Sequence, residues 1–185
     1  MKKIVVFASG SGSNFEVIVK KLHGQVCDVA LLVCDKPEAY CLERAKRLGI
    51  KTLQLTLADF SSKACYEYEM IKHLKEINPD LIVLAGYMKF IGETLLHEYE
   101  GKIINIHPSL LPAFPGADGI GDAIKYGVKV MGATVHYVDA GIDTGQIIDQ
   151  DSFKRANDET NAETIERIHQ IEHDLYPKVI ERLLK

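Results

Sequence analysis

The 185-residue chain has no tryptophan, only four cysteines and no excess of basic residues. Its 22 lysines and arginines are outnumbered by 26 aspartates and glutamates. This charge balance argues against a nucleic-acid-binding protein. No apolar run approaches the roughly 18 residues that a membrane span needs. The apolar run after Met1-Lys2-Lys3 is too short for a secretion signal, so we expect a cytoplasmic protein.

The four cysteines include no C-x-x-C pair, the spacing most typical of a metal site. Cys27, Cys34 and Cys41 fall near predicted strand and helix positions, and the fourth is Cys65. We therefore expect reduced thiols that pack as small hydrophobic side chains, and no metal site.

The chain does contain a regular alternation of short apolar runs and amphipathic stretches. The apolar runs predict strands over 4–8, 29–33, 52–55, 81–85 and 103–107. The stretches between them predict helices, of which the third carries an apolar stripe of Ala64, Tyr68, Ile71 and Leu74 and ends at Asn78. This alternation predicts a Rossmann-like, doubly wound, mostly parallel sheet with helices on both faces.

The pattern changes after Pro115-Gly116. A short helix around 122–126 precedes two further strands, 133–138 and 146–148, which can pair antiparallel. A long helix from about Thr160 to Leu184 closes the chain. With no linker or repeat, we expect a single domain over 1–185, with a phosphate-binding half at about 1–100 and a catalytic half at about 101–185.

The first candidate for chemistry lies at the end of the strand 103–107. Asn105 and His107 are two residues apart, so their side chains leave the same face of a strand. An amide donor beside an imidazole at a strand's carboxyl end can hold an oxyanion and transfer protons. Alternatively, these side chains satisfy loose backbone groups at the strand end, which fits this stretch alone equally well.

Three loops are expected to meet near this strand end. In doubly wound sheets, ligands bind beyond the carboxyl ends of the strands where the strand order reverses. If the strands 4–8 and 81–85 are neighbours, the loops 10–14, 86–90 and 107–115 converge there. The topology therefore predicts a site between them.

The loop Gly10-Ser11-Gly12-Ser13-Asn14 opens a helix directly after a strand. Such a loop binds anions through backbone N–H groups and the positive end of the helix dipole. It lacks the third glycine of a dinucleotide fingerprint and the lysine of a Walker A loop, so it suits a single phosphate. The alternative is an ordinary helix start with Ser13 or Asn14 as N-cap.

Asp143 lies in a glycine-flanked loop after the strand that carries His136. If it reaches His107, its carboxylate would favour the charged imidazolium and fix the orientation of the ring. The alternative is a turn aspartate that caps its own backbone.

A second carboxylate, Glu172, interrupts the apolar stripe that the last helix forms with Ile165, Ile168, Leu175 and Val179. A carboxylate that faces the core is costly unless it has a partner. That partner is either a bound hydroxyl or amine or a neighbouring histidine, His169 or His173.

Together, the loop 10–14, the stretch Asn105-Ile106-His107-Pro108-Ser109-Leu110-Leu111-Pro112 and Asp143 resemble the phosphoribosylglycinamide formyltransferase family. These are the folate-dependent glycinamide ribonucleotide transformylases of purine synthesis, and the resemblance covers essentially the whole chain. It implies the formyltransferase fold and transfer of the formyl group of 10-formyltetrahydrofolate to the amine of 5'-phosphoribosylglycinamide. These two small molecules are the expected partners, and we expect a monomer or a weak homodimer.

The resemblance also implies roles for particular residues. The family's catalytic trio matches Asn105, His107 and Asp143. Its phosphate-binding loop matches Gly12, Ser13 and Asn14, and its substrate-binding carboxylate matches Glu172. Its folate-binding positions match Lys63, Met88, Lys89, Phe90, Ile91, Asn105, Asp139, Ala140 and Gly141. Leu111-Pro112 matches a family turn with a cis peptide bond.

The sequence departs from the family pattern in two places. Many relatives carry His-x-His where Ala117-Asp118-Gly119-Ile120 stands here, so an accessory role of those histidines does not carry over. Lys63 and Lys89 stand where relatives often have arginine, which keeps the charge but loses the bidentate fork.

Other functions fit some of the same residues. Hydrolysis of formylfolate is one, although relatives with that activity usually carry an N-terminal regulatory domain that we do not expect here. A non-enzymatic nucleotide-sensing module is another, and it would not need Asn105, His107 and Asp143 to converge. The ending Asp143-Thr144-Gly145 also resembles methionyl-tRNA formyltransferase, which has an additional C-terminal domain that we do not expect either.

Overall fold

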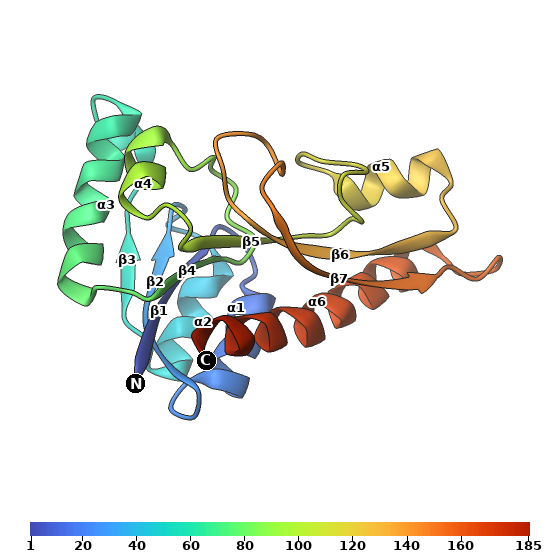
Figure 1. The fold of residues 1–185 in the computed structure, drawn as a ribbon, viewed down its shortest axis with the longest axis horizontal. Helices are drawn as coiled ribbons and strands as arrows, with labels where there is room; N and C mark the ends of the chain where they lie inside the picture. The colour runs from blue at the N-terminus through green and yellow to red at the C-terminus, as the bar shows by residue number, and fades with distance from the viewer.

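One seven-stranded sheet runs through the protein, which a computed structural model describes from Met1 to Lys185 (Figure 1). The strands are β1 (Lys2–Ala8), β2 (Cys27–Cys34), β3 (Thr52–Gln54), β4 (Leu81–Leu84), β5 (Ile103–His107), β6 (Val130–Tyr137) and β7 (Ile147–Lys154). The helices are α1 (Ser13–Leu22), α2 (Tyr40–Leu48), the 3-10 helix η1 (Leu57–Asp59), α3 (Lys63–Ile77), α4 (Glu93–Glu98), α5 (Gly119–Tyr126) and α6 (Asn161–Leu184).

The strand order is β3-β2-β1-β4-β5-β6-β7. The first five of these strands pair parallel, whereas β6 and β7 join antiparallel. The predicted doubly wound sheet and the antiparallel pairing of the two late strands are confirmed. The chain leaves β1 toward β2 and later returns to β4 on its other side, so the strand order reverses between β1 and β4.

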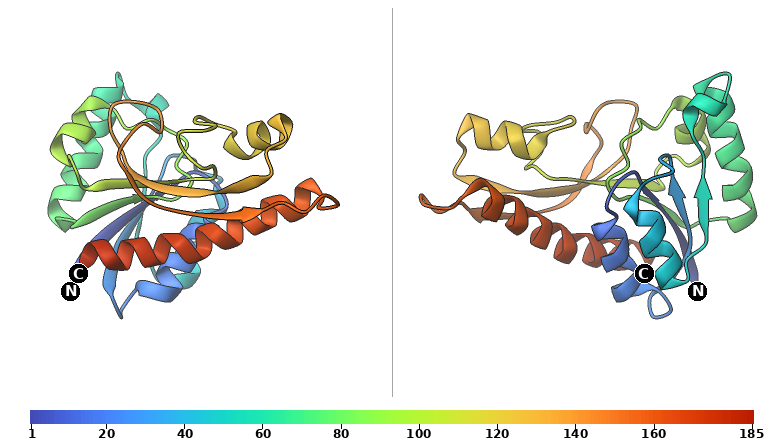
Figure 2. Two further views of the ribbon diagram at one scale, coloured as in Figure 1. Left: turned by 45° about the vertical axis from the view of Figure 1, so that its right-hand side comes forward. Right: turned by 180° about the vertical axis from the view of Figure 1, so that it is seen from behind.

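The alternation of side chains along β1 divides the core into two layers. Ile4 and Val6 pack with apolar residues of α1, α2 and α6 on one face of the sheet, whereas Val5 and Phe7 pack with α3 and α4 on the other. The two groups of helices lie on opposite faces of the sheet (Figures 1 and 2). A strand buried on both faces explains why the run 4–8 is continuously apolar.

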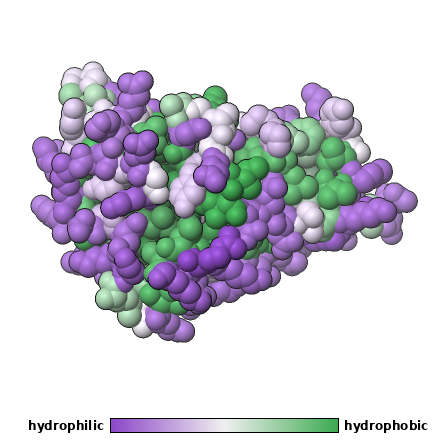
Figure 3. All heavy atoms as spheres, viewed as in Figure 1, coloured by the Kyte–Doolittle hydropathy of each residue, from purple (hydrophilic) through white to green (hydrophobic).

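Hydrophilic side chains cover the outer surfaces of the helices. Viewed as in Figure 1, hydrophilic residues lie over α3 and along α6, and apolar residues gather across the middle of this face (Figure 3). No helix combines enough length and apolar character to cross a membrane.

Several local expectations are corrected by the structure. In α3, Ala64 and Tyr68 are exposed, because the buried face is rotated toward Tyr66 and Met70, which contact the sheet together with Ile71 and Leu74. In α6, Ile165 is 37% exposed because the buried face at this end of the helix runs through Thr164 and Ile168.

Helix boundaries also differ in places. α1 begins after Gly12, its N-cap, not after Ser13 or Asn14, and it ends at Leu22. The short helix α4 falls in a stretch for which no helix was expected. The predicted end of α3 at Asn78 is confirmed, and α2 ends with Gly49 as its C-cap.

All four cysteines are free thiols. Cys27, Cys34 and Cys41 are buried as predicted, but Cys65 is exposed on the first turn of α3. The Leu111–Pro112 peptide bond is cis, as the resemblance implied.

Candidate active site

A cavity of about 550 Å³ opens at the carboxyl ends of β1, β4 and β5, where the strand order reverses. Segments far apart in the sequence line it: 10–14, 84–91, 105–108, parts of 116–120 and 136–143, and His169 and Glu172 of α6. Every predicted site residue except Lys63 belongs to this lining. Lys63 is exposed at the first residue of α3 and does not reach the cavity.

The segment 10–14 presents an open helix N-terminus to the cavity. Gly12 is the N-cap of α1 with φ 73°, and no side chain caps the helix. The first N–H groups of an α-helix have no intrahelical partner, so here they are available to an anion. A Cβ on Gly12 would lie 2.5 Å from Cβ of Cys41, so the close approach of α2 leaves room only for glycine.

Glu172 faces this loop from α6. It is 6% exposed, and its Oε2 accepts a hydrogen bond of 3.4 Å from Nδ2 of Asn14. Burial raises the pKa of Glu172 to about 7, and the bond from Asn14 only partly opposes this rise. Its protein partner is therefore Asn14, not the neighbouring histidines that the sequence suggested.

Asn14 has unused hydrogen-bonding capacity on the same side. Its Oδ1 is buried without a partner. A carboxylate and an amide oxygen, both acceptors, thus lie next to the open helix N-terminus. Hydroxyl groups adjacent to a bound phosphate would satisfy both.

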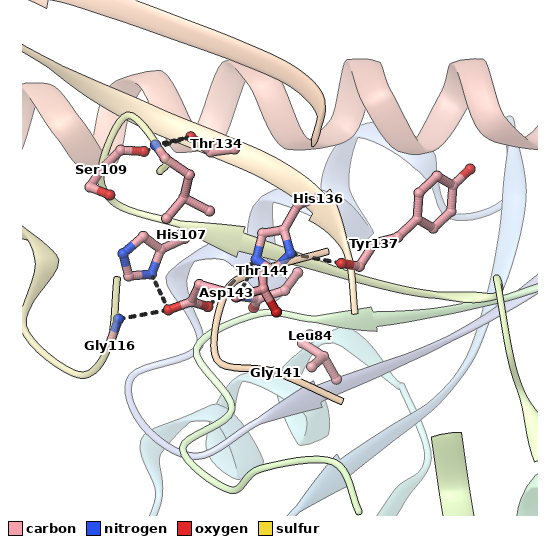
Figure 4. A network of polar contacts seen from close by, with 12 residues as sticks. Leu84, His107, Ser109, Gly116, Thr134, His136, Tyr137, Gly141, Asp143 and Thr144 are labelled. Carbon is pink, nitrogen blue, oxygen red and sulfur yellow. Dashed lines mark hydrogen bonds and ion pairs between the residues drawn. The ribbon is translucent and has the colours of Figure 1, made fainter. Parts of the chain in front are cut away.

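His107 and Asp143 meet at the other end of the cavity. Nδ1 of His107 lies 3.4 Å from Oδ2 of Asp143, which also accepts the N–H of Gly116 at 2.8 Å (Figure 4). Nε2 of His107 lies 2.8 Å from the carbonyl oxygen of Phe114. Both ring nitrogens therefore face oxygen acceptors, and the form of the ring that satisfies both is the imidazolium.

Asp143 is held in its loop by its backbone and by its neighbours. It has φ 53°, a left-handed conformation that is uncommon for residues other than glycine. Asp139 shapes the same loop, because its Oδ1 accepts from the N–H of Gly141 at 3.0 Å and from the hydroxyl of Thr144 at 2.7 Å. The turn-capping role that was the alternative for Asp143 thus belongs to Asp139.

Asn105 is oriented from the neighbouring strand. It is paired with His136 across β5 and β6, and its Nδ2 lies 3.2 Å from Nε2 of that ring. Nδ1 of His136 lies 2.8 Å from the carbonyl oxygen of Tyr137, to which it donates, so Nε2 accepts from Asn105. One N–H of the Asn105 amide is left for a ligand.

Asp143 lies between the two histidines, since its Oδ1 is 3.6 Å from Nε2 of His136 (Figure 4). Asn105, His107 and Asp143, which were predicted to form one site, therefore lie close together. His136 is a fourth residue of this site. The role of His136 has no local signal, because it depends on the antiparallel register of β5 and β6.

Residues 117–120 have local structural roles. Asp118 is the N-cap of α5 and accepts from the N–H of Gly121 at 3.0 Å. A Cβ on Gly119 would lie 2.7 Å from Nε2 of His107, so this glycine lets α5 approach the imidazole. No histidine lies in this segment, and the backbone of Phe114 bonds the ring instead.

His169, which was expected only as an alternative partner for Glu172, also lines the cavity. It precedes Glu172 by three residues on α6, and both line the cavity. The i, i+3 spacing, which places two side chains on one helix face, was the signal that could have assigned it to the site.

A profile of the formyl transferase family matches residues 2–180 of the chain. The chain belongs to the formyl transferase family. The phosphoribosylglycinamide formyltransferase of Bacillus subtilis is 54% identical over 187 residues, which cover 100% of this chain and 95% of that protein.

Solved structures agree with this assignment. Glycinamide ribonucleotide transformylase 1 from Geobacillus kaustophilus is 52% identical with a TM-score of 0.96. Phosphoribosylglycinamide formyltransferase from Streptococcus pneumoniae TIGR4 is 49% identical with a TM-score of 0.95. In both comparisons 100% of each chain is covered. The expected formyltransferase fold is confirmed.

The lining of this formyl transferase cavity includes exposed apolar side chains. Met88 and Phe90, from the segment after β4, are 64% and 65% exposed, and Ile142 is 50% exposed. Large apolar side chains held in water at a cavity mouth are typical of a site that receives an apolar or aromatic ligand.

Proposed function

We propose that this formyl transferase transfers the formyl group of 10-formyltetrahydrofolate to the amine of 5'-phosphoribosylglycinamide, a step of de novo purine synthesis. The observation that carries the proposal is the presence of an open helix N-terminus in the same cavity as Asn105, His107 and Asp143. The first suits a phosphate and the second a carbonyl that gains negative charge. The relatives in Bacillus subtilis and Streptococcus pneumoniae carry names that match this activity.

The phosphorylated amine binds at the deep end of the cavity. The N–H groups at Gly12, Ser13 and Asn14 hold its phosphate, and Glu172 accepts hydrogen bonds from its sugar hydroxyls. The folate ring binds at the rim, against the segments 88–91 and 139–143, and the exposed Lys89 provides a positive charge for its acidic tail. The acceptor amine and the formyl group then meet beside Asn105.

Transfer is direct in this proposal. The amine attacks the formyl carbon, a C–N bond forms, and the formyl oxygen becomes an oxyanion. The free N–H of Asn105 donates to that oxyanion. The positive charge of the His107 ring, whose Nε2 faces Phe114 and whose Nδ1 faces Asp143, stabilises it electrostatically.

Asp143 has two roles in the same step. Its negative charge beside Nδ1 of His107 supports the positive ring while the oxyanion forms. As the bond from the formyl carbon to the folate nitrogen breaks, a proton moves from the amine to that nitrogen, through Asp143 and water. No cysteine lines the cavity, so the step uses no thiol nucleophile from this chain.

A single absorbance assay tests the proposal and separates it from hydrolysis. The protein is mixed with 10-formyltetrahydrofolate, with and without glycinamide ribonucleotide, and release of the deformylated folate is followed. We expect product only when the amine is present. Product without the amine would indicate a hydrolase, and no product in either mixture would contradict a formyl transferase of this specificity.

A further inference from the structure

The back of the loop 10–14 rests on α2, an element with no part in the function proposed above. The N–H of Cys41 donates to the carbonyl of Gly10 at 3.0 Å, and Nε of Arg44 donates to the carbonyl of Ser11 at 2.8 Å. Two successive carbonyls of the loop are thus bonded to the same helix.

These bonds decide where the loop's N–H groups point. In a trans peptide unit the C=O and the following N–H are directed oppositely across one plane. Carbonyls of Gly10 and Ser11 that point at α2 therefore turn the N–H groups of Ser11 and Gly12 away from α2. Ser11 and Gly12 line the cavity, so the N–H groups face the side where an anion would bind.

Arg44 is itself held firmly. Its guanidinium lies over the ring of Tyr40, 5.0 Å from the centroid, and forms a close ion pair with Glu16. Its side chain is only 21% exposed, and it does not line the cavity. Arg44 therefore acts on the loop from behind and does not touch a ligand in the cavity.

Arg44 also affects phosphate binding through its ion pair with Glu16. It lies in the first turn of α1, where its negative charge alone would oppose a phosphate at the same helix N-terminus. Lys20 at 2.7 Å, Arg47 at 3.2 Å and Arg44 all pair with it, so three cations leave an excess of two positive charges. Of the three, Arg44 is the least exposed to solvent and so the least screened.

We propose that Arg44 is a positioning residue for phosphate recognition: it fixes the Ser11–Gly12 peptide and neutralises Glu16 behind the loop. The inference rests on the proposed function for the identity of the phosphorylated substrate. The chemistry that it concerns, a phosphate monoester at the N-terminus of α1, is independent of the formyl donor.

The test compares Arg44→Met, which keeps an unbranched apolar stem but removes the charge and the N–H donors, with Arg44→Lys and with Arg47→Met as a matched control. Arg47 pairs with Glu16 but forms no hydrogen bond with the loop, and its side chain is 56% exposed. We expect Arg44→Met to raise KM for glycinamide ribonucleotide about tenfold or more, the effect of one charge-assisted hydrogen bond, with little change in kcat or in KM for the folate. Arg44→Lys should fall between the native protein and Arg44→Met, and Arg47→Met should change KM less than about twofold.

Dephosphorylated glycinamide riboside separates positioning from damage to the fold. For this acceptor, kcat/KM of Arg44→Met should equal that of the native protein. A variant that is merely less well folded would instead lose kcat on both acceptors. Equal losses on both acceptors, or an unchanged KM for the phosphorylated one, would overturn the proposal.

Inorganic phosphate provides a readout that does not need turnover. Its dissociation constant, measured by calorimetry on native protein, Arg44→Met and Arg44→Lys, should rise in the same order as KM. If the native protein shows no transfer to glycinamide ribonucleotide, the proposed function fails, while this titration still decides whether Arg44 governs phosphate binding. A phosphate affinity that is equal in native protein and both variants would contradict the role of Arg44.

Discussion

The two ends of the cavity are built from different parts of the chain. The phosphate end is backbone from one short segment, 10–14, set by the parallel strand β1 and the helix α1 that follows it. The catalytic end is made of side chains from β5, β6 and the loop at Asp143, in the antiparallel part of the sheet. Substitutions that add side-chain atoms should disrupt a site made of backbone groups. Substitutions that remove side-chain atoms should disrupt a site made of side chains.

The difference also separates the kinetic constants. Groups that hold a remote phosphate stabilise the bound substrate and the transition state alike, so their loss raises KM. Donors aimed at a charge that exists only in the transition state affect kcat. Substitutions at the two ends should therefore be distinguishable by which constant changes.

The largest effect is expected for Asn105→Ala at the catalytic end. Loss of one oxyanion donor should lower kcat about 10²–10³-fold, equivalent to roughly 3–4 kcal/mol, with KM for the amine nearly unchanged. Steady-state kinetics at saturating concentrations of both substrates measure this, and a native melting temperature would show that the fold is intact. Wild-type turnover in this variant would remove Asn105 from the mechanism.

Glu172→Gln tests the one charged side chain at the phosphate end. Burial raises the pKa of Glu172 from an ordinary 4.5 to about 7. Between these pH values the folded protein holds a proton that the unfolded chain has released, so the free energy of unfolding falls as the pH rises. Above pH 7 the buried charge lowers the free energy of unfolding by about 3 kcal/mol, and glutamine, which carries no charge, avoids this loss.

Urea unfolding of the native protein and of Glu172→Gln, measured from pH 4.5 to 8, tests the direction of this pH dependence. The variant should be more stable by up to about 3 kcal/mol at pH 8, and the difference should vanish near pH 4.5. The same variant should bind the phosphorylated amine more weakly, because an amide replaces an ionised acceptor. A stability difference that does not vary with pH would contradict the buried, high-pKa carboxylate.

Much of the phosphate end was predictable because it is local in sequence. The apolar run 4–8, the glycines after it and the helix that follows are consecutive, and each follows from short-range stereochemistry. The switch point was expected on the condition that β1 and β4 are neighbours, and the strand order confirms that they are. The contact of α2 with the back of the loop 10–14 was not predictable, because it forms only in the folded chain.

The residues of the catalytic end were predictable, but the contacts between them were not. Asn105 and His107 share a strand, so their common face was evident, whereas the contact of Asn105 with His136 depends on register across two strands. α4 was missed for a similar reason. Its N-terminus is capped by Glu67 of α3, which accepts from the N–H groups of Gly92 and Leu95, and a tertiary cap leaves no local signal.

Gly12→Ala should break the backbone site without touching the catalytic trio. The added Cβ would meet Cys41 at 2.5 Å, and φ of 73° is unfavourable for alanine by about 1–2 kcal/mol before that clash is counted. We expect a lower melting temperature and a raised KM for the phosphorylated amine. Gly10→Ala, whose Cβ meets nothing within 4 Å, is the matched control and should melt like the native protein. Equal melting temperatures for all three proteins would refute the steric argument.

The smallest effect is expected for Lys89→Ala, at the exposed rim. Lys89 lines the cavity mouth but forms no ion pair within the chain, so it provides only a solvent-screened charge for an acidic folate tail. Its loss should raise KM for 10-formyltetrahydrofolate about threefold, with kcat and KM for the amine unchanged, as for other exposed charge pairs. The difference should shrink as the salt concentration rises from 0.05 to 0.5 M, because screening weakens the attraction in the native protein. A salt-independent effect, or one on the amine instead of the folate, would place Lys89 at the wrong end of the cavity.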